Sequence, residues 1–278
     1  MEKDLSNWLV VSDIDGTLNN KFRFMPKANY DAIDRFINKL SGNFTLASGR
    51  GIESMRPHFE KLPKGKKAPA VIINGAGIYD YEKEKLLFFN PVDEQGREVA
   101  RCVLEKFPSC EVQIINVDHI YTVNPKIIAP LMRSSDPLKN TDCRSIEDVP
   151  FGEWGKVIFM ALPKMMKDII VYIGSLETDR LSFMPSSVIS YEMLGENTNK
   201  GTAVLKVAQM LGIDKSHTAA IGDYFNDYEM LRSVGLPACC GQAPEGLKKI
   251  AEFQACHCNK GAVADLLRHI ESLENNQI

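Results

Sequence analysis

The sequence predicts an α/β fold: a core with a mainly parallel, Rossmann-like sheet, into which an α+β domain is inserted. Short apolar runs of strand type alternate with helical periodicity near both ends of the chain, and the runs end in polar or glycine residues. Between residues 82 and 192 the pattern changes to paired, hairpin-like strands. Alternating strands and helices are typical of a parallel sheet, whereas consecutive strands favour antiparallel pairing.

The first predicted elements alternate between strand and helix. The continuous apolar run at residues 8–12 fits a strand that is buried on both faces of a sheet. Apolar residues then recur at three- and four-residue intervals from Tyr30 to Leu40, which predicts an amphipathic helix closed by Gly42. Two more apolar runs, at residues 44–47 and 70–73, enclose a helical segment and continue the alternation.

The inserted domain begins where strand-like runs start to follow one another. Residues 78–81 and 86–89 flank a charged turn, as in a hairpin. The remaining elements predicted here are helices at 94–106 and 164–176 and strands at 112–115, 120–123, 156–162, 181–184 and 188–193.

The strand and helix alternation returns at Lys200. A helix with apolar residues between Val204 and Leu211 precedes a strand at 218–221, a helix near 227–234 and a final helix whose apolar residues run from 263 to 273. The sequence therefore predicts a core domain made of residues 1–81 and 193–278, and an inserted α+β domain of residues 82–192.

Composition limits the classes of partner. Lysine and arginine number 33 against 36 acidic residues, so the net charge of −3 gives no general attraction to nucleic acid or to an anionic membrane. The apolar run from Trp8 to Val11 is too short for a signal peptide or a membrane span. The seven cysteines lack the spacing of a disulfide framework, which favours reduced thiols and a cytoplasmic location.

Two acidic residues follow the first predicted strand. Asp13 and Asp15 are two residues apart, so an extended chain can turn both carboxylates to one side, and Gly16 permits a sharp turn after them. This position is the carboxyl end of a sheet strand, where open α/β sheets bind ligands. On their own, these residues fit a capped turn equally well.

A second acidic cluster favours a ligand-binding site over a capped turn. Asp223, Asn226 and Asp227 follow the strand at 218–221. Carboxylates gathered in one crevice repel each other unless a cation or strong donors hold them ionised. Oxygen ligands without nearby histidine or cysteine favour Mg²⁺.

Two more segments supply groups that an anion needs. Ser48 and Gly49 follow the strand at 44–47, and Lys200 opens a helix. Ser48 could simply cap the next helix, and Lys200 could be a surface residue. A lysine at a helix N-terminus opposes the helix dipole, however, so its position indicates a nearby anion.

These segments, in this order, resemble the four motifs of the haloacid dehalogenase superfamily of phosphohydrolases. Residues 13–18 resemble the first motif, residues 44–50 the second, Lys200 the third and residues 222–227 the fourth. The inserted domain, together with Asn74-Gly75-Ala76, is similar to the Cof-type subgroup, which carries a large α/β cap of the C2 (type IIB) kind.

The resemblance implies a Mg²⁺-dependent phosphatase, a phosphoric monoester hydrolase that acts on sugar phosphates or related small metabolites through an aspartyl-phosphate. It implies Asp13 as nucleophile and Asp15 as general acid and base. Arg50 would anchor structure. The metal is assigned to Asp13, Asp15 (through its carbonyl), Asp223 and Asp227, and the phosphate to Ser48, Gly49, Lys200 and Asn226.

Some features leave alternatives open. Tyr224 and Phe225 stand where relatives often have smaller residues, which could restrict access to the site. A phosphotransferase of the hexose-phosphate mutase type would share the aspartyl-phosphate chemistry, and a metabolite-binding protein without catalysis is a third alternative. Trp154, Lys156 and Arg133 are candidates for substrate contact, although an isolated aromatic or basic residue more often packs or is solvated. The sequence does not indicate an oligomeric state.

Overall fold

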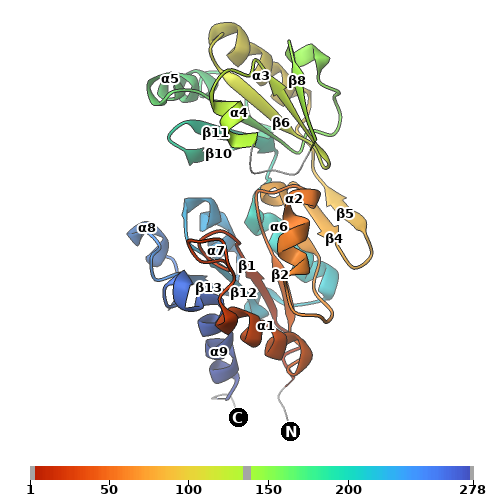
Figure 1. The fold of residues 1–278 in the computed structure, drawn as a ribbon, viewed down its shortest axis with the longest axis vertical. Coiled ribbons are helices and arrows are strands. Elements are labelled where there is room, and N and C mark those ends of the chain that lie inside the picture. Colours follow the sequence, from red (N-terminus) through yellow and green to blue (C-terminus); the bar gives the residue numbers. More distant parts are fainter. Residues whose placement is uncertain (1–3, 134–138, 276–278) are drawn as a thin grey trace.

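The computed structural model describes residues 4–133 and 139–275. Figure 1 shows two lobes, one above the other, with both described chain ends in the lower lobe. We call the lobe with the five-stranded sheet the core and the lobe with the six-stranded sheet the cap. No helix in the described part of the chain is long and apolar enough to cross a membrane.

The core sheet is parallel throughout and confirms the predicted fold class. Its strand order is β14-β13-β12-β1-β2. The register places Ser12 beside Ile221 and beside Leu46, so these three strands end at one edge of the sheet. The strands are β1 (Leu9–Ser12), β2 (Asn43–Leu46), β12 (Thr218–Gly222), β13 (Leu236–Cys239) and β14 (Phe253–Gln254).

Helices cover both faces of the core sheet. Alternate residues of β1 point to opposite faces: Val10 packs in the cluster of α1 and α9, and Leu9 and Val11 pack in the cluster of α6 and α7. Burial on both faces explains the continuous apolar run of this strand. The core helices are α1 (Lys27–Asn38), α2 (Ile52–Glu60), α6 (Lys200–Leu211), α7 (Tyr228–Ser233), α8 (Glu245–Lys248) and α9 (Ala262–Asn275).

A small antiparallel sheet lies where the chain leaves the core for the cap. The order is β3-β4-β5, formed by β3 (Ala70–Ile72), β4 (Gly77–Asp80) and β5 (Lys85–Phe89). The predicted hairpin is therefore present. The third apolar run does not pair as a strand with the five described strands of the core sheet and is linked to the segment after β2 by a bridge between Ala47 and Val71.

The cap contains an antiparallel sheet with one parallel pair, in the order β10-β11-β9-β6-β7-β8. Helices α3 (Glu94–Lys106) and α5 (Pro163–Ile173) pack with it around a core that contains Trp154 and Phe159. The short helix α4 (Ile128–Arg133) contacts β6. The strands are β6 (Glu111–Ile115), β7 (His119–Val123), β8 (Lys139–Cys143), β9 (Lys156–Met160), β10 (Leu181–Ser187) and β11 (Ser190–Gly195).

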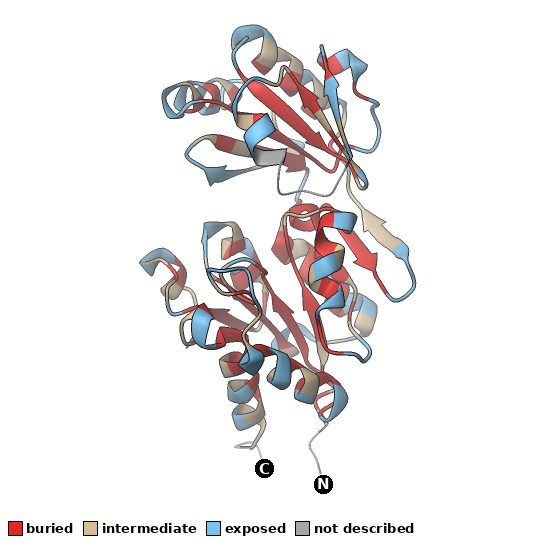
Figure 2. Cartoon of the chain, viewed as in Figure 1, coloured by how far each residue is buried: buried red, intermediate tan, exposed pale blue. Residues whose placement is uncertain are grey.

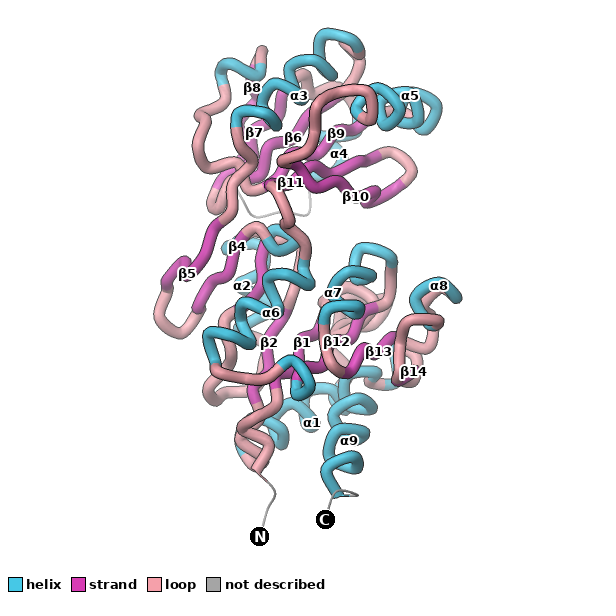
Figure 3. The backbone as a smooth tube through the Cα atoms, turned by 180° about the vertical axis from the view of Figure 1, so that it is seen from behind, coloured by secondary structure: helices cyan, strands magenta, loops and turns pink. Residues whose placement is uncertain are grey.

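Strand pairing refines the expected domain limits of 1–81, 82–192 and 193–278. Strand β5 pairs with β4 of the core-side sheet, and β11 continues to Gly195 within the cap sheet. We therefore propose that the cap runs from Asn90 to Gly195. Figure 2 shows that buried residues line the central strands of both lobes, and Figure 3 shows the core helices and the cap from behind.

Candidate active site

The predicted site residues meet between the core and the cap. Asp13 follows β1, Ser48 follows β2 and Asp223 follows β12, at the edge of the core sheet that faces the cap. They border a cavity of about 530 Å³ that is also lined by Met184 and Glu192 of the cap. Asp15, Gly49 and Asn226 lie on the same cavity. The structure thus brings together segments separated by more than half the chain.

The turn after Asp15 lets two acidic loops approach closely. Gly16 has a φ of +83°, and a Cβ added there would lie 2.2 Å from a carboxylate oxygen of Asp223. A side chain at this position would therefore displace Asp223 as well as strain the turn. The Nε2 of Gln242 donates to the Gly16 carbonyl over 2.6 Å and fixes the turn from the C-terminal segment.

Lys200 joins the first acidic loop to the second. Its side chain is 1% exposed, and its Nζ donates to Oδ1 of Asp13 over 2.6 Å and to Oδ1 of Asp227 over 2.7 Å. It is the first residue of α6, whose N-terminus is capped by the side chain of Asn199. The two carboxylates explain why a lysine is placed where the helix dipole opposes it.

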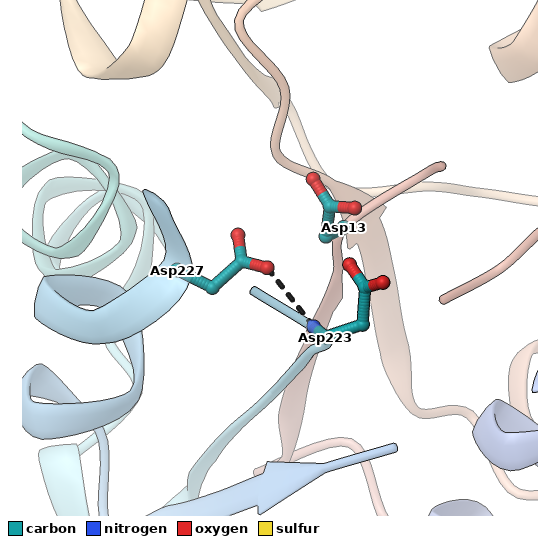
Figure 4. Close-up of side chains that lie close together, drawn as sticks. All are labelled: Asp13, Asp223 and Asp227. Carbon is teal, nitrogen blue, oxygen red and sulfur yellow. Dashed lines mark hydrogen bonds between the residues drawn. The ribbon is translucent and has the colours of Figure 1, made fainter. Parts of the chain in front are cut away.

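Three carboxylates crowd around this lysine. Figure 4 shows Asp13, Asp223 and Asp227 converging from two loops, with the Asp223 amide donating to Oδ2 of Asp227 over 3.1 Å. One oxygen of each carboxylate lies within 4.8 Å of the others. Lys200 is the one cation that the described contacts place on these three carboxylates, so the cluster carries more negative than positive charge when the carboxyl groups are ionised. This all-oxygen donor set with surplus negative charge fits a hard divalent cation such as Mg²⁺.

Burial changes the proton affinity of these groups. Burial and the neighbouring Asp227 raise the pKa of Asp13 to about 7, although Lys200 opposes the change. Burial and Asp227 also raise the pKa of Asp223 to about 6. Burial lowers the pKa of Lys200, but Asp13 and Asp227 outweigh it and the net shift is upward, so the ammonium stays charged.

These raised pKa values predict how the stability of the metal-free protein depends on pH. Asp13 and Asp223 hold protons more tightly in the folded state than in the unfolded state, where their pKa is near 3.8. The folded state therefore binds more protons between about pH 4 and pH 7, and the free energy of unfolding falls as pH rises through this window. We expect a fall on the order of a few kcal/mol.

Urea denaturation at pH 5 and pH 8, with chelator and with Mg²⁺, checks this expectation. A cation competes with protons for the same carboxylates, so Mg²⁺ should stabilise the protein more at pH 8 than at pH 5. Equal stabilisation at the two pH values would contradict the assignment of the cation to this cluster.

The second carboxylate of the first motif has a different environment. The side chain of Asp15 is 49% exposed, and its Oδ2 accepts from the Arg50 guanidinium over 2.7 Å. It lies outside the cluster formed by the other three carboxylates. Arg50 lines the cavity as well as bonding to Asp15, and its role as a structural anchor stays a prediction.

Asp227 uses both carboxylate oxygens within the protein. Oδ1 accepts from Lys200, Oδ2 accepts from the Asp223 amide, and the side chain is fully buried. This arrangement favours an indirect role for Asp227, through Lys200, over direct contact with a metal. The carboxylates of Asp13 and Asp223 keep more capacity for a ligand.

The cap contributes charged residues to the cavity. Lys156 and Glu192 line the cavity, as does Asn74 of the core. Trp154, in contrast, is fully buried in the cap, and its Nε1 donates to the Pro150 carbonyl over 2.6 Å. Trp154 therefore packs and does not contact a ligand. The side chain of Arg133 lies outside the described part of the chain.

Two exposed aromatic residues lie next to each other in the second acidic loop. Tyr224 and Phe225 are 57% and 49% exposed, and their rings meet edge to face with centroids 5.4 Å apart. Tyr224 lines the cavity that contains Asp13. Their effect on access stays a prediction.

Comparisons with known proteins agree with this geometry. Residues 10–267 match the family of haloacid dehalogenase-like hydrolases. An HMP-PP phosphatase from Cronobacter sakazakii is 26% identical, over 92% of this chain and 93% of its own. A haloacid dehalogenase-like hydrolase from Bacteroides thetaiotaomicron has a similar structure, with a TM-score of 0.81, 18% identity and coverage of 95% of this chain and 99% of its own.

The chain belongs to the family of haloacid dehalogenase-like hydrolases. This confirms the resemblance that its four motifs indicated. A solved subclass IIB sugar phosphatase of this superfamily also shares the fold, with a TM-score of 0.78, 16% identity and coverage of 95% of this chain and 99% of its own. The prediction of a phosphoric monoester hydrolase agrees with the names of these relatives.

Proposed function

We propose that this protein is a Mg²⁺-dependent phosphatase that hydrolyses phosphate monoesters of small metabolites, such as sugar phosphates, through an aspartyl-phosphate on Asp13. The observation that carries the proposal is the cavity between core and cap, which holds Asp13 and Asp15 together. The Nζ of the buried Lys200 donates a hydrogen bond to Oδ1 of Asp13 over 2.6 Å and so fixes that oxygen. A nucleophile and a partly exposed acid thus border one space that can hold a substrate.

The reaction proceeds in two displacements at phosphorus. The Asp13 carboxylate attacks phosphorus, the bond to the ester oxygen breaks, and Asp15 donates a proton to that leaving oxygen. Asp15, now a carboxylate, takes a proton from a water molecule that attacks the phosphorus of the aspartyl-phosphate. The bond to Asp13 then breaks, inorganic phosphate leaves, and both carboxyl groups return to their starting states.

Donors around the cavity would hold the phosphoryl oxygens. Ser48, the Gly49 amide, Lys200 and Asn226 are assigned this role, since they border the site or bind its nucleophile. Fixed donors stabilise the charge that spreads over the phosphoryl oxygens in the transition state. Arg50 donates to Oδ2 of Asp15 and keeps its carboxyl group at the cavity, which leaves the other carboxyl oxygen to carry the proton that Asp15 gives to the leaving group.

The cation would be held by the carboxylates of Asp13 and Asp223 and by the backbone carbonyl of Asp15, with Asp227 acting through Lys200. When bound, Mg²⁺ neutralises negative charge between the nucleophile and the phosphoryl group. The crowding of three carboxylates within 4.8 Å supports this assignment.

Relatives support the choice of substrate. Their names give HMP-PP and sugar phosphates as the compounds on which they act. We therefore propose that this chain acts on small phosphorylated metabolites. All seven cysteines are free thiols, which fits a reducing compartment, and we propose the cytoplasm.

Phosphate release from a panel of sugar phosphates, nucleotides and phosphorylated cofactors tests the proposal. We expect release from at least one group of esters, a loss of about 100-fold or more on chelation, and recovery with Mg²⁺. Formation of an isomeric phosphate ester without inorganic phosphate would instead identify a phosphotransferase. Full activity in excess chelator would refute the role of the metal.

A further inference from the structure

Three buried polar side chains that line the cavity are bonded to one another. Lys156 and Glu192 belong to the cap, Asn74 belongs to the core, and each is 5–6% exposed. Oε2 of Glu192 accepts from Nζ of Lys156 over 3.0 Å and from Nδ2 of Asn74 over 2.7 Å. We call these residues the polar triad. The mechanism above does not use them.

Neighbouring strands fix the two cap residues. Glu192 lies opposite Ile158 in the pairing of β11 with β9, so Lys156 is its diagonal neighbour on the same face of the sheet. Figures 1 and 3 show β10 and β11 on the side of the cap that faces the core. Cavity-facing charges on rigid strands hold a more constant position than charges on loops.

Asn74 links the triad to the loop of Ser48 and Gly49, which we call the phosphate loop because the phosphate is assigned to it. Its backbone amide donates to the Ser48 carbonyl over 2.9 Å, and its side chain packs against Gly49 so closely that a Cβ there would lie 3.0 Å from Oδ1. Asn74 holds the left-handed conformation, with a φ of +53°. The distance between the phosphate loop and the triad is therefore set by short, direct contacts.

The triad has hydrogen-bonding capacity that the described residues do not use. Oδ1 of Asn74 is buried without a partner in the described part of the chain. Lys156 has three ammonium hydrogens, and Glu192 is its one hydrogen-bond partner among the described contacts. Buried polar atoms without partners are rare in folded proteins, and they mark a place where a ligand or water completes the bonding.

The charges of the triad select the kind of group that fits. Lys156 and Glu192 neutralise each other, so the pair attracts neither a second phosphate nor an amine. A donor and an acceptor 3.0 Å apart match a hydroxyl group, which accepts and donates at the same time.

We propose that the polar triad forms hydrogen bonds with a hydroxyl group on the leaving group of the substrate. The preferred esters should therefore carry an uncharged, polyhydroxylated leaving group. This inference rests on the proposed phosphatase function and deepens it. A merely structural triad, which only joins cap to core, would affect all substrates alike.

A ratio of rates on two substrates distinguishes recognition of a hydroxyl group from a purely structural role of the triad. We would measure kcat/KM for glucose 6-phosphate and for its 2-, 3- and 4-deoxy forms, and take the largest ratio between the parent and a deoxy form. We expect about 10- to 100-fold in the wild-type protein, the usual value of hydrogen bonds to charged groups. In Glu192→Gln the same ratio should fall to within about threefold of one. General damage cancels in such a ratio.

Two other variants strengthen the test. Glu177→Gln makes the same chemical change at an exposed position of the cap and should keep the wild-type ratio. If Glu192→Gln fails to fold, because it leaves the buried charge of Lys156 without a partner, the double change Lys156→Met with Glu192→Leu removes both charges. Its ratio should also fall toward one.

Charge gives a second, independent readout. Glu192→Gln leaves one positive charge at the triad, so the rate on fructose 1,6-bisphosphate relative to fructose 6-phosphate should rise about tenfold. Lys156→Met leaves one negative charge and should lower the same quotient.

Several outcomes would overturn the inference. A wild-type ratio near one for every deoxy form, or an unchanged ratio in Glu192→Gln, would assign the triad a structural role. If the wild-type protein released phosphate from no ester at all, the proposed function would fail, and the same ratios taken from dissociation constants measured by calorimetry would then decide on the triad.

Discussion

Replacing Asp13 with asparagine is expected to lower the rate of phosphate release by about 10⁴-fold or more. The amide is nearly the same size as the carboxylate, but it cannot attack phosphorus to form the acyl phosphate. Lys200 would keep its bond to Asp227, over 2.7 Å, so the fold should persist. Initial rates over the substrate panel, with circular dichroism to check folding, measure the effect.

Asp31→Asn is the matched control for this prediction. Asp31 lies on the exposed face of α1, bonded only to Lys27 among the described contacts, and its replacement should leave turnover within about twofold of wild type. Turnover of Asp13→Asn near the wild-type rate, in protein that contains no residual aspartate from deamidation, would refute the covalent mechanism. Trapped phosphate on wild-type Asp13, found by mass spectrometry after acid quenching, would support it directly.

The sequence predicted most of the core because its strands are buried on both faces. Continuous apolar runs such as that of β1 are visible without a partner, and the polar residues after them mark the edge of the sheet. Strands β13, β14 and β8 were missed for physical reasons. Pro237 interrupts the strand pattern of β13, β14 has two residues, and β8 (Lys139–Cys143) is mostly polar.

The same reasoning explains which site residues were predicted. Asp13, Ser48 and Asp223 each follow an apolar strand, so a local pattern indicates them, and parallel pairing brings them together. Lys156 was a candidate for substrate contact as an isolated basic residue, but no local pattern indicates Glu192, its ion-pair partner 36 residues further along the chain. The register of β11 on β9, which a local sequence pattern does not show, brings the two side chains together.

The arrangement around Lys200 shows that one residue serves stability and chemistry together. Its ammonium compensates two buried carboxylates and so permits a charged nucleophile in a buried position. Glycines enforce the packing nearby: a Cβ on Gly201 would lie 2.2 Å from Oγ of Ser233. The start of α6 is therefore held against α7. This packing fixes the backbone of Lys200, from which its side chain reaches Asp13.

Lys200→Met should consequently destabilise the metal-free protein by about 3–5 kcal/mol at pH 8, because Asp13 and Asp227 would be left as buried carboxylates without their counter-ion. Lys200 opposes the rise in the pKa of Asp13, so without the lysine Asp13 holds its proton still more tightly in the folded state than in the unfolded state. The folded state then binds more protons, so the free energy of unfolding falls as pH rises, and the loss should be smaller at pH 5 than at pH 8.

Urea denaturation at the two pH values measures this loss, and phosphate release should fall by about 10²- to 10³-fold, as for other fixed groups that stabilise transition-state charge. Lys206→Met, on the exposed face of the same helix, is the control. Its ammonium lies 4.6 Å from the centroid of the Phe88 ring, and its removal should cost about 1 kcal/mol or less at either pH. If Lys200→Met lost no more stability than Lys206→Met at pH 8, the buried carboxylates would have to be protonated already, and Asp13 would then not be the charged nucleophile that the mechanism requires.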